Sequence, residues 1–125
     1  MPSNILVIED DKDIGAMVLW TLTSEGLSAT LVTSRDDALH QLDASPFDTI
    51  LMDYSMPGMA ADEFSELVRV HWPATRLIVI TAADKSAILA RKISADGYID
   101  KPFDPTSLTQ KIKNLSAGAR GQAPY

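Results

Sequence analysis

Residues 5–11 read Ile-Leu-Val-Ile-Glu-Asp-Asp, four aliphatic side chains followed at once by three carboxylates. Continuous apolar runs of this length are typical of strands that are buried on both faces of a parallel sheet. Acidic side chains that directly follow such a strand lie at its carboxyl end, where doubly wound sheets bind their ligands. The stretch therefore predicts a buried strand that delivers charged groups to a site at one edge of the sheet.

The rest of the chain repeats this alternation of strand and helix. Apolar or β-branched runs predict strands at residues 5–8, 29–32, 49–52, 77–80 and 98–99. The segments between them space their apolar residues as helices do, and residues that favour helix ends flank them: Gly26 and Pro73 as stops, and Ser34, Asp84 and Asp104 with Pro105 as starts. Five βα units in strict alternation predict an α/β fold with a doubly wound, five-stranded parallel sheet and helices on both faces.

The composition indicates one domain inside the cell. A chain of 125 residues with 46% hydrophobic residues can build a single core, and we expect a domain at residues 1–117 and a flexible tail or linker stub at 118–125. The sequence has no cysteine, which excludes disulfides and thiolate sites. The longest aliphatic runs are too short to span a membrane, and the N-terminus lacks a secretory pattern. We therefore expect a cytoplasmic protein whose chain begins at its fold.

The charge pattern favours protein partners over nucleic acid. The net charge is −6, and the 11 lysines and arginines are scattered rather than clustered into a basic stripe. Binding to a nucleic-acid backbone needs such a stripe. We therefore expect no direct contact between this domain and nucleic acid, and no contact with a membrane.

Polar side chains follow four of the predicted strands: Glu9 and Asp10 the first, Asp53 the third, Thr81 the fourth and Lys101 the fifth. Carboxylates crowded into one cleft repel one another, and a divalent cation relieves this; the small number of protein ligands suits Mg²⁺ better than Ca²⁺. A metal, a hydroxyl and an ammonium group beside a carboxylate are what an incoming phosphoryl group requires. The pattern predicts that Asp53 is a phosphoryl-accepting nucleophile.

Four motifs, in this order, resemble the receiver domain of two-component response regulators in the CheY-like superfamily. The similarity covers residues 4 to about 116, and the motifs are Ile-Leu-Val-Ile-Glu-Asp-Asp at 5–11, Leu-Met-Asp-Tyr-Ser-Met-Pro-Gly at 51–58, Ile-Thr-Ala at 80–82 and Asp-Lys-Pro-Phe at 100–103. The resemblance implies a flavodoxin-like (βα)5 architecture with strand order 2-1-3-4-5. It also implies a Mg²⁺ site in which Asp10 and Asp53 bind through their side chains, Glu9 acts largely through water, and Ser55 supplies a backbone carbonyl.

The same resemblance assigns the phosphoryl contacts and a switch. Thr81 is expected to hydrogen-bond the phosphoryl group, Lys101 to pair with it, and Tyr98 to be the switch aromatic. The bond between Lys101 and Pro102 is expected to be cis, as in the family. Two features depart from the family: Ala60 and Ala61 stand where an acidic residue and a glycine are common, and the stretch between Thr81 and Lys101 is about two residues shorter, which predicts a trimmed fourth helix or preceding loop.

The resemblance implies a signalling switch rather than an enzyme. Asp53 would take a phosphoryl group from a phosphohistidine of a sensor histidine kinase or a histidine phosphotransfer protein, and slowly lose it. The output would pass to a downstream protein or an output domain outside this chain, or through a phosphorylation-dependent dimer. Alternatives are a Mg²⁺-dependent aspartyl-phosphate phosphatase, which needs an acidic residue at the position of Ser55, a flavodoxin-like cofactor binder, which the acidic loop 9–13 disfavours, and a non-phosphorylated scaffold.

Overall fold

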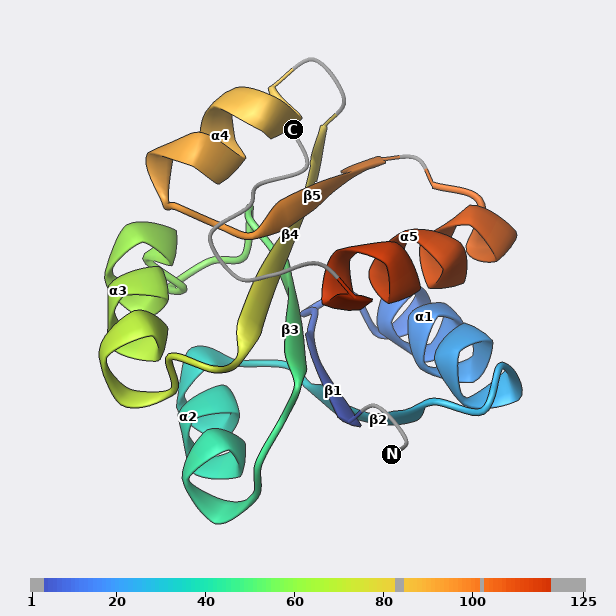
Figure 1. Ribbon diagram of the computed structural model, residues 1–125, viewed down its shortest axis with the longest axis horizontal. Coiled ribbons are helices and arrows are strands. Elements are labelled where there is room, and N and C mark those ends of the chain that lie inside the picture. The colour runs from blue at the N-terminus through green and yellow to red at the C-terminus, as the bar shows by residue number, and fades with distance from the viewer. Residues whose placement is uncertain (1–3, 83–84, 102, 118–125) are drawn as a thin grey trace.

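The structure is a computed structural model that describes residues 4–82, 85–101 and 103–117. Five strands and five helices alternate along these ranges (Figure 1): β1 (Asn4–Ile8), α1 (Lys12–Ser24), β2 (Ser28–Val32), α2 (Arg35–Ala44), β3 (Thr49–Asp53), α3 (Ala61–His71), β4 (Arg76–Ala82), α4 (Ser86–Lys92), β5 (Gly97–Lys101) and α5 (Pro105–Ala117). All strand pairs are parallel, in the order β2-β1-β3-β4-β5. The predicted fold and strand order are confirmed.

The sheet separates two hydrophobic cores. Neighbouring residues of β1 point to opposite faces, so Leu6 and Ile8 belong to one core while Ile5 and Val7 belong to the other. Helices α2, α3 and α4 cover the first face, and α1 and α5 cover the second (Figure 1). Because β3 lies at the centre of the sheet, all five of its residues are buried.

Strands β4 and β5 extend beyond their predicted bounds. The apolar runs predicted residues 77–80 and 98–99, whereas the strands cover 76–82 and 97–101. The added residues include polar ones that pair in register, Thr81 with Asp100. Ladder bonds are made by the backbone, so polar side chains can continue a strand that hydropathy alone would end.

The start of α1 is fixed by Asp11, whose carboxylate accepts hydrogen bonds from the backbone N–H groups of Asp13 and Ile14 at 2.9 and 3.1 Å. At its other end, the Leu27 N–H donates to the Leu22 carbonyl at 3.1 Å, and Gly26 takes the left-handed backbone conformation with φ of 84°. The predicted stop at Gly26 is therefore correct.

Other predicted helix ends compare as follows. Ser34 caps α2 by accepting from the Asp37 N–H at 3.1 Å, α3 ends at His71 just before Pro73, and α5 begins at Pro105. Helix α4 has seven residues, with Lys85 at its N-cap. The predicted cap Asp84, the predicted cis bond to Pro102 and the predicted tail at 118–125 lie outside the described residues.

No helix in the described ranges is both long and apolar enough to span a bilayer.

Candidate functional site

Three carboxylates from two strand ends converge at the carboxyl edge of the sheet. Glu9 and Asp10 follow β1, and Asp53 is the last residue of β3, the neighbouring strand. One carboxylate oxygen from each lies within 4.8 Å of the others. Glu9 and Asp53 are buried, whereas Asp10 is exposed. The sequence prediction that these side chains form one cluster is thus met by the geometry.

The Glu9 carboxylate is only partly satisfied. Its Oε1 accepts a hydrogen bond from the Asp11 N–H at 3.1 Å, while Oε2 is buried and accepts none from the residues that the structure describes. Burial raises the pKa of Glu9 to about 7, and the nearby negative charge of Asp53 adds to this, although the Asp11 N–H and the Lys101 ammonium oppose it. A buried carboxylate with one unpartnered oxygen, together with two other carboxylates nearby, is a donor set that fits a hard divalent cation.

The acidic triplet at 9–11 divides between two roles. Asp11 turns away from the cluster and caps α1, while Glu9 and Asp10 join Asp53. The cap also positions the site, because the N–H of Asp11 holds the Glu9 carboxylate. Sequence spacing placed all three residues at the strand end but could not show which carboxylate serves the helix.

A single cation contacts this cluster in the described part of the chain. Lys101, at the end of β5, places Nζ 3.1 Å from Asp53 Oδ2, and the Lys101 side chain is 31% exposed against 7% for Asp53. The other oxygen of Asp53, Oδ1, accepts from the Ser55 N–H at 3.0 Å. Both oxygens of the carboxylate are therefore held, and its orientation is fixed before any ligand arrives. The direct pairing of Lys101 with Asp53 had not been predicted; the sequence indicated only that both face the same edge.

Thr81 is buried near the end of β4, beside β3. Asp53 pairs with Ile80 in the parallel register, so Thr81 is the next residue along the adjacent strand. Tyr98 lies in β5 opposite Val79 and is partly buried against the core beneath α2, α3 and α4. The Nζ of Lys111 stands 5.2 Å from the centre of the Tyr98 ring, within cation–π range.

The loop between Asp53 and α3 contains two residues in the left-handed backbone region. Gly58 has φ of 73° and Ala60 has φ of 49°, and Ala60 occupies the N-cap of α3 without a capping side chain. Met56 and Met59 anchor this loop in the core, where they are 6% and 1% exposed. The loop next to Asp53 is therefore held by hydrophobic packing rather than by a cap.

Comparison with known proteins agrees with this geometry. The family model described as response regulator receiver domain matches residues 5–113. The chain belongs to this family. As a receiver domain it is a signalling module, and the resemblance found in its four motifs is confirmed. Its relatives are response regulators rather than classical enzymes, which disfavours the phosphatase and cofactor-binder alternatives.

Two curated relatives show the degree of similarity. The sensory transduction protein RegX3 of Mycobacterium tuberculosis is 27% identical over 113 residues, and the match covers 89% of this chain and 49% of RegX3. The phosphate regulon transcriptional regulatory protein PhoB of Klebsiella pneumoniae is 32% identical over 118 residues, covering 90% of this chain and 51% of PhoB. The receiver domain therefore spans about half the length of these relatives.

Solved structures share the fold. The chemotaxis response regulator CheY4 of Vibrio cholerae is 26% identical with a TM-score of 0.83, and the match covers 92% of this chain and 99% of CheY4. The BeF3-activated receiver domain of DrrB, a Thermotoga maritima protein, is 26% identical with a TM-score of 0.79, covering 92% of this chain and 97% of that one. Both similarities extend over nearly the whole receiver domain.

Proposed function

We propose that this receiver domain is a phosphoryl-accepting switch of a two-component or phosphorelay system, phosphorylated on Asp53. The observation that carries the proposal is the pairing of the Asp53 carboxylate with Lys101 at 3.1 Å beside two further acidic groups. A carboxylate whose two oxygens are already oriented is prepared for in-line attack on phosphorus.

The acidic cluster supports a Mg²⁺ cofactor. Glu9, Asp10 and Asp53 would hold the ion together with the backbone carbonyl of Ser55, and the buried, unpartnered Oε2 of Glu9 is a reason to expect it there. When bound, Mg²⁺ supplies positive charge that offsets the negative oxygens of the phosphoryl group. By resemblance to the family, Asp10 and Asp53 would bind the ion through their side chains, and Glu9 would act largely through water.

Two other side chains would respond to the new phosphoryl group. Lys101 would exchange its contact with the Asp53 carboxylate for one with a phosphoryl oxygen, and the Thr81 hydroxyl would donate a hydrogen bond to another. Drawing Thr81 inward would shift the end of β4, and the Tyr98 ring on the neighbouring strand would follow into the space released. The partial burial of Tyr98 against the core is consistent with such a movement.

The partners follow from the same chemistry. Response regulators work with sensor kinases, and for this receiver domain the phosphoryl donor would be a phosphohistidine of a sensor histidine kinase or a histidine phosphotransfer protein. The signal would pass to a downstream protein or to an output domain beyond this chain, in the cytoplasm. The scattered basic residues favour an output by protein contacts rather than by direct contact of this domain with nucleic acid.

The test is intact-mass spectrometry after incubation with Mg²⁺ and a small acyl-phosphate donor. One phosphoryl adduct is expected on the wild type and none on Asp53→Asn, which keeps the shape of the side chain but removes the nucleophile. Asp43→Asn, a change of an exposed carboxylate on α2, is the matched control and should be labelled like the wild type. If no adduct forms even with a phosphohistidine donor protein, the scaffold alternative is favoured.

A further inference from the structure

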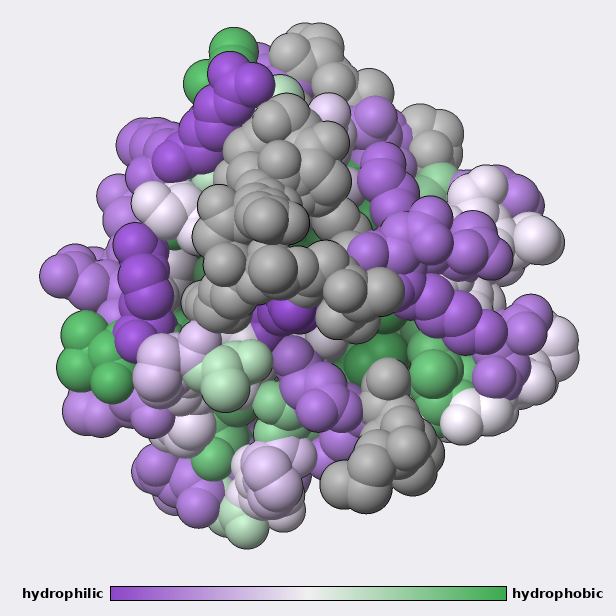
Figure 2. Space-filling model, viewed as in Figure 1, coloured by the Kyte–Doolittle hydropathy of each residue, from purple (hydrophilic) through white to green (hydrophobic). Residues whose placement is uncertain are grey.

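A cation on α5 stands over the aromatic ring of Tyr98 in β5. The Nζ atom of Lys111 lies 5.2 Å from the centre of this ring, within cation–π range. Lys111 is exposed on α5, where Figure 2 shows hydrophilic residues at the surface. It forms no salt bridge with any residue in the ranges that the structure describes. In this part of the chain, the ammonium group is therefore held by an aromatic ring rather than by a carboxylate.

A carboxylate on the same strand has an acceptor atom to spare. Asp100 lies two residues after Tyr98, and because side chains alternate along a strand, both point away from the face that carries Ile99. The Oδ1 atom of Asp100 is buried and accepts no hydrogen bond from the residues that the structure describes. A buried oxygen of this kind gains strongly from a charged donor that reaches it. Asp100 is therefore suited to bind a nearby ammonium group.

One small cavity brings the cation and the carboxylate together. It has a volume of about 210 Å³, lies between the end of β5 and the first turns of α5, and is lined by both Asp100 and Lys111. Asp104 also lines it, but Asp104 is exposed, and its Oδ2 accepts a hydrogen bond from the Ser107 hydroxyl at 3.3 Å. Residues two apart in a strand are separated by about 7 Å, a distance that a lysine spans by changing rotamers. Lys111 can therefore reach either Tyr98 or Asp100.

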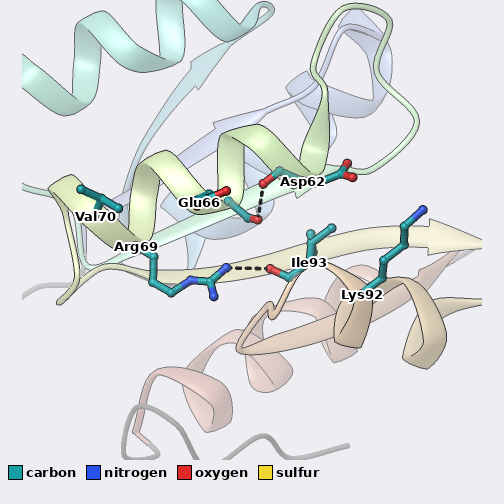
Figure 3. A pocket seen from close by; sticks show the side chains of 7 residues that line it. Asp62, Glu66, Arg69, Val70, Lys92 and Ile93 are labelled. Atoms are coloured by element: carbon teal, nitrogen blue, oxygen red, sulfur yellow. Dashed lines mark hydrogen bonds between the residues drawn. The ribbon is translucent and has the colours of Figure 1, made fainter.

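The backbone that leads into β5 is anchored to its neighbours. The Arg69 guanidinium of α3 donates a hydrogen bond to the Ile93 carbonyl, just after α4, at 3.2 Å (Figure 3). The Asp96 carboxylate, directly before β5, accepts from the Leu77 N–H of β4 at 2.7 Å. A change around Tyr98 is therefore expected in side-chain rotamers rather than in the position of the strand.

We propose that Lys111 is a positioning residue for Tyr98, which holds the ring where it now lies and moves to Asp100 when the ring turns inward. The proposal rests on the function proposed above, in which Tyr98 moves after phosphorylation. In the present arrangement the ammonium group stabilises the ring and leaves Asp100 Oδ1 without a partner. After the turn, the ammonium group loses the ring and gains the carboxylate. Each arrangement thus offers Lys111 one partner, which disfavours intermediate positions of the ring.

Double-mutant cycles in urea unfolding test the exchange of partners. Lys111→Met removes the charge but keeps an aliphatic side chain, and Asp100→Asn removes the charge but keeps the shape. With Tyr98 present, the two changes should be coupled by less than about twofold in the unfolding equilibrium constant, because the lysine contacts the ring. In a Tyr98→Leu background, which offers no aromatic face, the coupling should rise to about fivefold, because the ammonium group then pairs with Asp100.

Fluorine NMR of protein labelled with fluorotyrosine tests the position of the ring itself. The chain has three tyrosines, and Tyr98→Phe identifies the Tyr98 signal by its loss. Lys111→Met should shift this signal, and Lys111→Arg should restore it, because a guanidinium also binds the face of an aromatic ring. Lys113→Met, at another exposed position of α5, is the matched control and should leave the signal unchanged.

Two results would overturn the proposal. One is a coupling between Asp100 and Lys111 that is the same with and without the Tyr98 ring, and the other is a Tyr98 signal that Lys111→Met does not shift. Both measurements are made without Mg²⁺ and without a phosphoryl donor. A failure to label Asp53 would therefore leave these results unaffected, and a failure of these results would leave the phosphorylation of Asp53 unaffected.

Discussion

Replacing Glu9 with glutamine should make the metal-free receiver domain more stable near neutral pH. The folded protein raises the pKa of Glu9 from 4.5 to about 7, chiefly because the carboxylate is buried. Since one pKa unit corresponds to about 1.4 kcal/mol, ionised Glu9 lowers the free energy of unfolding by about 3 kcal/mol. Glutamine resembles the protonated side chain in shape and removes this cost.

The sign of the pH dependence follows from proton binding. Between pH 4.5 and about 7 the folded state holds a proton on Glu9 that the unfolded state has lost, so the stability of the wild type falls as pH rises through this window. The stability difference between Glu9→Gln and the wild type should therefore be small below about pH 4.5 and approach its full size, about 3 kcal/mol, above about pH 8.

Urea denaturation of both proteins across this pH range, with a chelator present, measures the difference. Asp43→Asn removes the same charge from an exposed site on α2 and serves as the control. Adding Mg²⁺ should stabilise the wild type more than Glu9→Gln, because the ion offsets the ionised carboxylate. A stability difference that does not change with pH, or a variant less stable than the wild type near pH 8 without Mg²⁺, would refute the reasoning.

Three further predictions concern the site, a turn and the core. Lys101→Met removes the cation that competes with a metal, so Mg²⁺ should bind about tenfold more tightly by titration calorimetry; unchanged affinity would count against the cluster as the metal site. Ser94→Gly should raise the free energy of unfolding by about 1 kcal/mol, because Ser94 has φ of 57°, whereas Ser45→Gly, at a cap with φ of −149°, should not. Leu108→Ala, at a buried position in α5, should lower the free energy of unfolding by about 3 kcal/mol, as measured by denaturant unfolding. Ile88→Ala, at an exposed position, should lower it by less than about 0.5 kcal/mol.

The sheet and the convergence of the site could be predicted because few physical rules decide them. Long apolar runs require burial on both faces, and parallel connections bring every carboxyl end to one edge, so Asp53 and Lys101 were expected at the same edge, although their direct contact was not predicted. Strand order needed the family resemblance as well. These features depend on patterns spread over many residues, which tolerate local exceptions.

Local backbone geometry could be predicted less well from the sequence. Nothing in the residue type of Ala60 or Ser94 indicates a left-handed conformation, because alanine and serine avoid it unless the surrounding structure imposes it. The ends of β4 and β5, at Ala82 and Lys101, were predicted two residues too early, at 80 and 99, because hydropathy does not report backbone pairing. The sequence also could not show that Asp11 caps α1 while Glu9 and Asp10 join Asp53, because this depends on where each side chain points in the folded chain.

The central position of β3 constrains how a signal can leave the site. This strand is flanked by β1 and β4, and each of its residues is buried, so its amide hydrogens should be among the slowest in the domain to exchange with solvent. Asp53 is therefore attached to a fixed support. Chemistry at this residue would then be transmitted by the segments that surround it, above all the edge strand β5, whose Lys101 contacts Asp53, while the strand that carries the modified group stays in place.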